Sequence, residues 1–147
     1  MKVFLEVEKG ENRGERYKLE LNRYRAIGRA DNGAHTAQFT PEGDVALDDE
    51  ELARVARHME RRRKGHVFAR WGVRRGNGYR RGPDILLNDA KVSRTHCMVF
   101  VDAQGASVVD LLSTNGVMVN GRRVSEADLI EGDIVHVGKS RCVVRFE

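Results

Sequence analysis

Cysteine is scarce in this sequence, and long apolar runs are missing. The 147 residues include two cysteines, Cys97 and Cys142, and neither has a cysteine or histidine partner at metal-ligand spacing. Because both lie in strand-like segments, we expect buried free thiols in preference to a disulfide. No apolar run approaches the ~18 residues of a membrane-spanning helix, and the N-terminal Met-Lys-Val-Phe does not resemble a signal peptide. We therefore expect no membrane segment and a cytoplasmic protein.

A large excess of charge of one sign is also lacking. The chain has 26 lysines and arginines against 22 acidic residues, so its net charge is +4. This mild bias is not typical of a nucleic-acid-binding domain, although basic residues gather in 54–64 and 70–81. In the second of these segments only Trp71 and Tyr79 offer rings on which bases can stack. Nucleic-acid binding through this basic region stays an alternative.

The residue sets that carry enzyme chemistry are missing as well. Paired carboxylates, a cluster of metal ligands and a nucleophile beside a base cannot be picked out of the sequence. His96 has no recognisable nucleophile or carboxylate partner. We therefore expect a protein that is not an enzyme and has neither a cofactor nor a metal.

Alternating apolar and polar residues predict strands at both ends of the chain. The segments with this period are 3–8, 17–21, 24–27, 96–102, 107–111, 134–137 and 141–146. Asn120-Gly121, with valines on both sides, predicts a hairpin because both turn positions favour positive φ. The length suits one domain. The pattern therefore predicts an all-β fold.

Two polar loops flank the strand at 96–102 and the strand that follows it. Ser93-x-x-His96 comes before the first strand, and Thr114-Asn115-Gly116 follows the second. Hydroxyl groups, an amide and backbone N–H groups would then meet at one edge of a β-sandwich. Such an edge suits a phosphate group.

These loops and several shorter motifs resemble the forkhead-associated (FHA) domain, a β-sandwich whose loops bind phosphothreonine peptides. The matching motifs are Gly28-Arg29, Asp84-Ile85-x-Leu87, Ser93-x-x-His96, Asp110, Asn115-Gly116, Val119-Asn120-Gly121 and Gly132-Asp133-Ile134-x-x-Val137-Gly138. Each motif is weak alone, but their order and spacing together are specific. The resemblance implies one FHA-like domain of antiparallel sheets over residues 1–147, with a helix-containing insertion at about 30–83.

The resemblance also implies which residues bind the phosphopeptide. They are Arg29, Lys91, Ser93, Arg94, Thr114 and Asn115. Arg29 would contact the phosphate, as would Ser93 through its hydroxyl and backbone, and Asn115 would bind the peptide backbone. Lys91 would read an acidic residue three positions after the phosphothreonine. Gly28, His96, Gly116 and Asn120 would support the site.

The insertion separates Arg29 from the strand at Ile85, which raises the question of whether Arg29 reaches the phosphate. Three arginines in the loop before Asp84 could replace or supplement it. They are Arg75, Arg80 and Arg81.

The implied function is that of an adaptor or scaffold in Ser/Thr kinase signalling. Its partner would be a phosphothreonine-containing protein, either a Ser/Thr kinase or a substrate of one. A second alternative is a pseudo-module that has kept the sandwich and binds a protein partner independently of phosphate. The sequence leaves the oligomeric state open.

The insertion has a helical pattern of its own. From Asp48 onward, Leu52, Val55, Ala56 and Met59 fall at i, i+3, i+4 and i+7, which predicts a helix with one apolar stripe. We expect this stripe to pack on the sandwich beside the phosphate loops. A short strand is predicted over 67–73. Residues 44–49 imitate 84–89 but lack a following Ser-x-x-His, so the sandwich strand is assigned to 84–87.

Overall fold

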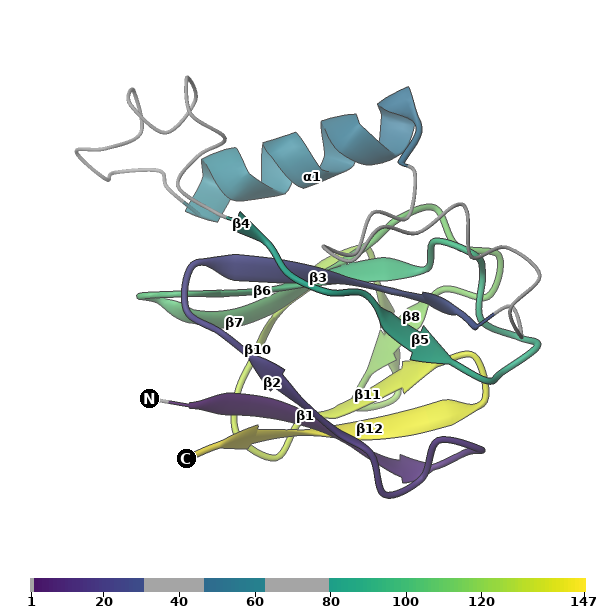
Figure 1. Ribbon diagram of the computed structural model, residues 1–147. Coiled ribbons are helices and arrows are strands. Elements are labelled where there is room, and N and C mark those ends of the chain that lie inside the picture. The colour runs from purple at the N-terminus through teal and green to yellow at the C-terminus, as the bar shows by residue number, and fades with distance from the viewer. Residues whose placement is uncertain (1, 31–46, 63–79) are drawn as a thin grey trace.

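The structure, a computed structural model, describes residues 2–30, 47–62 and 80–147 and shows two sheets packed face to face (Figure 1). The first sheet, which is antiparallel, has the order β2 (Arg16–Leu19), β1 (Val3–Lys9), β12 (Ser140–Phe146), β11 (Ile134–Val137), β8 (Val117–Val119) and β9 (Arg122–Val124). Its strands bury alternate residues, such as Val3, Leu5 and Val7. The all-β sandwich expected from the period of two is confirmed.

The second sheet carries the strands that lead to the candidate site. Its order is β10 (Glu126–Leu129), β7 (Gly105–Asp110), β6 (Cys97–Asp102), β3 (Arg23–Arg29) and β4 (Arg80–Arg81), and β5 (Ile85–Leu87) also pairs with β3. Pairing of β5 with the end of β3 supports the choice of 84–87 as the sandwich strand. Both β4 and β5 run parallel to β3, so this sheet is mixed and not purely antiparallel. The insertion makes this possible, because parallel neighbours need a long crossover.

The two cysteines lie in the core between the sheets. Cys97 and Cys142 are free and buried, as expected from the sequence. Burial raises the pKa of Cys97 well above its usual range and that of Cys142 to about 12. Both thiols therefore act as small apolar side chains.

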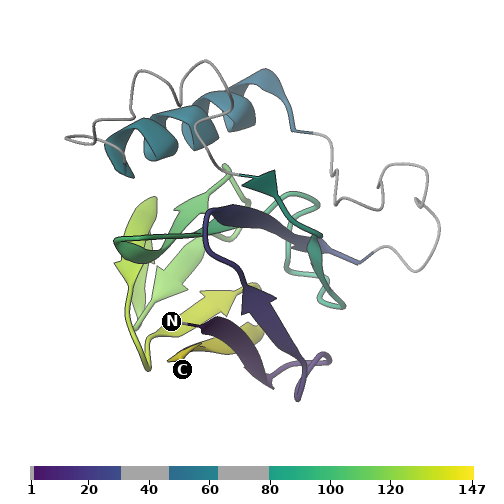
Figure 2. The ribbon, with the colours of Figure 1, turned by 60° about the vertical axis from the view of Figure 1, so that its left-hand side comes forward.

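The insertion contributes helix α1 (Asp49–Arg62), which lies across the outer side of the second sheet (Figures 1 and 2). Asp48 starts it with a capping box, since Glu51 N–H donates to the Asp48 carboxylate (2.8 Å) and Asp48 N–H donates to the Glu51 carboxylate (2.9 Å). Val55 and Met59 pack with apolar residues of the sheet, among them Phe100. The helix is therefore a packed part of the domain.

The buried face of α1 differs from the predicted stripe. Leu52 is 50% exposed and Ala56 is exposed, whereas His58 is buried beside Val55 and Met59. His58 is buried because it has hydrogen-bond partners on the sheet, and a pattern of apolar residues cannot reveal such partners. The strand predicted at 67–73 lies outside the described residues.

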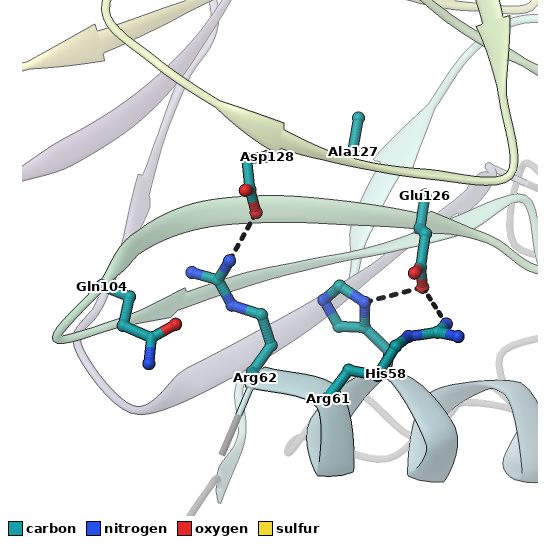
Figure 3. Close-up of a pocket in the computed structure, with 7 residues that line it drawn as sticks. All are labelled: His58, Arg61, Arg62, Gln104, Glu126, Ala127 and Asp128. Carbon is teal, nitrogen blue, oxygen red and sulfur yellow. Dashed lines mark hydrogen bonds and ion pairs between the residues drawn. The ribbon is translucent and has the colours of Figure 1, made fainter. Parts of the chain in front are cut away.

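A polar network fastens the C-terminal half of α1 to the sheet. His58 contacts Glu126 through Nδ1 (3.1 Å) and Ser107 Oγ through Nε2 (2.9 Å). Arg62 donates to both carboxylate oxygens of Asp102 (2.9 Å each) and also pairs with Asp128. Figure 3 shows Glu126 and Asp128 of β10 pointing toward these helix residues. The same residues line a cavity of about 400 Å³. No helix in the described part of the chain is long and apolar enough to cross a membrane.

Candidate functional site

Three loops meet at the end of the sandwich where β3 ends. The loop between β5 and β6 holds Ser93, and the loop between β7 and β8 holds Thr114 and Asn115. Arg29 N–H donates to the Ser93 carbonyl (3.1 Å), and Thr114 N–H donates to Ser93 Oγ (3.0 Å). Asn115 Nδ2 donates to the Lys91 carbonyl (2.8 Å). Ser93 is therefore the residue through which the three loops are joined.

His96 holds this junction from inside the protein. Its side chain is fully buried, with Nδ1 accepting from Ser93 N–H (3.0 Å) and Nε2 bonded to the Gly116 carbonyl (2.8 Å). The ring therefore carries its proton on Nε2 and is neutral. Because Ser93 N–H is used by His96, the hydroxyl is the Ser93 donor left for a phosphate. That both the hydroxyl and the backbone of Ser93 bind the phosphate stays a prediction.

The buried histidines predict how stability depends on pH. Burial lowers the pKa of His96 and of His58. The unfolded chain, with a histidine pKa of about 6.5, then binds more protons than the folded protein between the two values. We expect the free energy of unfolding to fall as the pH drops from about 6.5, by at most about 1.4 kcal/mol per pH unit for each histidine. Urea denaturation at pH 7.5, 6.5 and 5.5 measures this, and equal stability at all three would contradict it.

Two residues that the sequence did not single out fix the loops. Ser113 Oγ accepts from Gly116 N–H (2.9 Å) and donates to the Asp110 carboxylate. Asp89 accepts from Lys91 N–H (2.9 Å), and also from Lys139 N–H and Ser140 Oγ in the turn after β11 (2.8 Å each). Burial opposes ionisation of Asp89, but these hydrogen bonds outweigh it and lower its pKa. Lys139 and Ser140 are about 50 residues away from Asp89 in the sequence, so no local pattern reveals these contacts.

Gly28 lets the serine loop pass directly over β3. A Cβ at this position would lie 2.2 Å from the carbonyl oxygen of Arg94, far inside contact distance. On either side of Gly28, Ile27 accepts from His96 N–H (2.9 Å) and Arg29 donates to Ser93. The strand and the loop are therefore pinned together where only glycine fits.

The rim of the junction is polar and basic. Lys91, Arg94, Thr114 and Asn115 are exposed. Arg29 is half-buried and reaches back over the loop, with Nη1 donating to the Val92 carbonyl (3.4 Å). The structure therefore brings all six predicted peptide-binding residues to this end, and the insertion does not carry Arg29 away. Hydroxyls, an amide and cationic groups in this arrangement can bind an anion.

Other predicted residues are not brought to the site. Arg80 and Arg81 pair with Arg23 and Tyr24 at the start of β3, about 17 to 20 Å along the strand from Arg29. Arg81 also forms an ion pair with Asp84 (3.2 Å). The structure thus places these two arginines away from the serine loop, at the opposite end of β3, and their supplementary phosphate contacts stay a prediction. Arg75 lies outside the described residues.

Asn120 lies in the hairpin between β8 and β9. It lies at the far end of β8 from Gly116, with φ 51°. Its side chain donates to Asp133 and accepts from Ile134 N–H, both at 2.9 Å. That Asn120 supports the phosphate loops stays a prediction, and these two hydrogen bonds join the hairpin to the start of β11.

The contacts of His58 have the order of a catalytic triad, but the serine is not accessible to a substrate. Ser107, His58 and Glu126 are linked in sequence by hydrogen bonds, as in a serine hydrolase. Ser107 is fully buried, however, so a substrate cannot reach its hydroxyl. The three residues hold the helix on the sheet.

Comparisons with known proteins agree with this geometry. Residues 73–138 match the family model described as FHA domain. The chain is 43% identical over 68 residues to FHA domain-containing protein FhaA of Mycobacterium tuberculosis, which covers 45% of this chain and 13% of FhaA. It is 43% identical over 60 residues to the glycogen accumulation regulator GarA of Mycobacterium tuberculosis, which covers 41% of this chain and 37% of GarA. The chain thus matches well under half the length of these relatives.

A solved structure shares the fold over nearly the whole chain. The FhaA FHA domain, complexed with the intracellular domain of Rv3910, superposes with a TM-score of 0.54 at 26% sequence identity and covers 97% of this chain and 99% of its own. The strands on both sides of the insertion are therefore arranged as in that domain. Residues 73–138 therefore match the FHA domain model, and the sandwich as a whole has the fold of the FhaA FHA domain.

Proposed function

We propose that this domain recognises phosphothreonine peptides and acts as an adaptor or scaffold in Ser/Thr kinase signalling. The observation that carries the proposal is the junction at Ser93. Its hydroxyl is oriented by Thr114 N–H, its loop is fixed by His96, and the cations Arg29 and Arg94 lie on the same loops. FHA domains are binding modules, and we propose binding without catalysis here too.

The groups at the rim match the chemistry of a phosphorylated side chain. A phosphothreonine carries about −1.5 to −2 charges and three acceptor oxygens. Ser93 Oγ accepts from Thr114, so its own proton is free to be donated to a phosphate oxygen. Guanidinium and ammonium groups of Arg29, Arg94 and Lys91 supply charge-assisted donors. Asn115 is exposed, and its amide is fixed by the hydrogen bond to the Lys91 carbonyl.

The partner that follows is a phosphothreonine-containing protein, either a Ser/Thr kinase or one of its substrates. The relative FhaA offers a parallel, since its FHA domain forms a complex with the intracellular domain of another protein. Adaptor and scaffold roles fit a module whose only chemistry is recognition.

A set of three matched peptides tests the proposal. A phosphothreonine peptide selected from a library should bind, its unphosphorylated twin should not, and its phosphoserine twin should bind several-fold more weakly. The last expectation follows because burying the threonine methyl is worth about 0.8 kcal/mol by transfer alone. Isothermal titration calorimetry measures all three. Library hits that do not depend on phosphate would instead support the pseudo-module.

The Ser93→Ala variant locates the site. Loss of one charge-assisted hydrogen bond costs about 1.5 to 3 kcal/mol, so affinity should fall roughly tenfold to more than a hundredfold while the fold is kept. Ser125→Ala is a matched control, because Ser125 is exposed in the connection between β9 and β10. Wild-type affinity in Ser93→Ala would show that the phosphate binds elsewhere.

Nucleic-acid binding through the helix is not favoured by its charge pairing. Arg61 pairs with Glu126, and Arg62 pairs with Asp102 and Asp128. These arginines are therefore neutralised by the sheet and not presented to a phosphate backbone. The basic segment 63–79 lies outside the described residues.

A further inference from the structure

Arg123 of β9 lies against the loop that carries Thr114 and Asn115. A Cβ added to Gly116 would be 2.5 Å from Arg123 Nε and 2.8 Å from its Cζ, so the guanidinium packs directly on the Gly116 backbone. Gly116 is itself held at both polar backbone atoms, by Ser113 and His96. Arg123 therefore rests on a rigid surface one residue away from Asn115.

The charge of Arg123 is not used within the described part of the protein. Ion pairs occupy Arg16, Arg23, Arg61, Arg62, Arg81, Arg141 and Arg145. Arg123 is exposed, and no carboxylate among residues 2–30, 47–62 and 80–147 lies within ion-pair distance of it. A guanidinium that is placed by packing and has no acidic neighbour keeps its paired donors for a ligand.

The position of Arg123 in the sheet determines which part of a bound peptide it can contact. β9 is the edge strand of the first sheet, and Arg123 stands opposite Met118, which is 37% exposed. A peptide held at Ser93 that crosses Asn115 and continues past Gly116 reaches this edge. Lys91 accepts a hydrogen bond from Asn115, and its loop is bonded through Asp89 to the turn after β11, on the opposite side of β8 from β9.

We propose that Arg123 binds a carboxylate side chain of the peptide, in the part that runs past Gly116 toward the β8–β9 hairpin. This inference rests on the proposed function and narrows its ligand to an acidic phosphothreonine peptide. The guanidinium offers two parallel donors, which match a carboxylate in geometry as well as in charge. Met118 provides an apolar contact for the methylene groups of the same side chain.

The test uses one phosphothreonine peptide that binds the wild-type protein. Each position within four residues of the phosphothreonine is changed in turn to Glu and to Gln, and both affinities are measured by calorimetry. At one position the wild type should prefer Glu by about three- to tenfold. In Arg123→Gln that preference should vanish, while affinity for the matching Gln peptide stays within about twofold of wild type.

Arg122→Gln is the matched control, because Arg122 precedes Arg123 on β9 and its side chain points to the opposite face. It should keep the preference for Glu. A preference that survives in Arg123→Gln, or that is lost in Lys91→Gln instead, overturns the inference. Equal weakening of both peptides by Arg123→Gln also overturns it, because Arg123 would then only support Gly116. A wild type that binds no phosphopeptide is a different result, in which the proposed function fails and the inference fails with it.

Discussion

Replacing Gly28 by alanine should abolish measurable phosphopeptide binding or weaken it at least tenfold. The new methyl group would sit 2.2 Å from the Arg94 carbonyl oxygen, so either β3 or the serine loop must move. The strand cannot yield easily, because its neighbours Ile27 and Arg29 are both hydrogen-bonded to that loop. Displacing the loop moves Ser93 and breaks its hydrogen bond to Thr114.

The size of this effect follows from the contacts at stake. Overpacking costs about 1 to 3 kcal/mol in stability. Binding loses a charge-assisted contact worth about 1.5 to 3 kcal/mol, which lowers the peptide affinity roughly tenfold to more than a hundredfold. Peptide affinity is measured by calorimetry, and retention of the β-sandwich by circular dichroism and a urea titration.

Gly82→Ala is the matched control for this experiment. Gly82 also has no positive φ, and a Cβ there would meet the flexible side chain of Arg25 at 3.2 Å, near the opposite end of β3. Peptide affinity should therefore be close to wild type in Gly82→Ala. If Gly28→Ala binds as tightly as Gly82→Ala, the serine loop is not the binding site or it moves without cost.

Replacing Arg62 by alanine should release helix α1 from the sheet. The Arg62 side chain is 9% exposed and that of its partner Asp102 is 10% exposed, and both guanidinium contacts are 2.9 Å long. Removing one member of a buried ion pair costs about 3 to 5 kcal/mol, because the other charge is left in place without a counter-ion. An isolated helix of 14 residues is marginal in water, so α1 should unfold when it leaves the sheet.

The loss should appear as a separate early step in unfolding. Once the helix leaves, Asp102 regains water and the sandwich stays folded, so a urea titration followed at 222 nm should show a helical transition before the main one. Arg61→Ala is the matched control, because Arg61 is 59% exposed and its pairing with Glu126 is worth less than about 1 kcal/mol. Equal stability of the two variants would show that the Arg62 pair does not hold the helix.

The docked helix is also connected to the candidate site. Arg54 Nη1 donates to the Asp110 carbonyl (3.1 Å), and the Asp110 carboxylate accepts from Ser113, which holds Gly116. The sequence-based expectation that the helix packs on the sandwich is confirmed. It covers the outer face of a sheet, and within the described residues the Arg54 hydrogen bond links it to the end of β7, where the loop with Thr114 begins. We therefore also expect Arg62→Ala to loosen these loops and to weaken peptide binding.

The sequence by itself determined the sheets and the two loops at Ser93 and Asn115. Successive side chains of a strand point to opposite faces of the sheet, so a period of two is a local property that can be read along the chain. The short motifs identified the loops for the same reason, since each is continuous in sequence. The burial of Cys97 and Cys142 also followed from their places in apolar strands.

Only the tertiary structure decided which distant residues meet. The parallel pairing of β4 and β5 with β3 puts Arg80 and Arg81 at one end of that strand and Ser93 at the other. The burial of His58 in place of Leu52 depended on Ser107 and Glu126, two residues of different strands. Arg123 reaches Gly116 because β9 folds back on β8. These positions depend on strand register and on the packing of polar groups across the sheet, and neither leaves a periodic trace in the sequence.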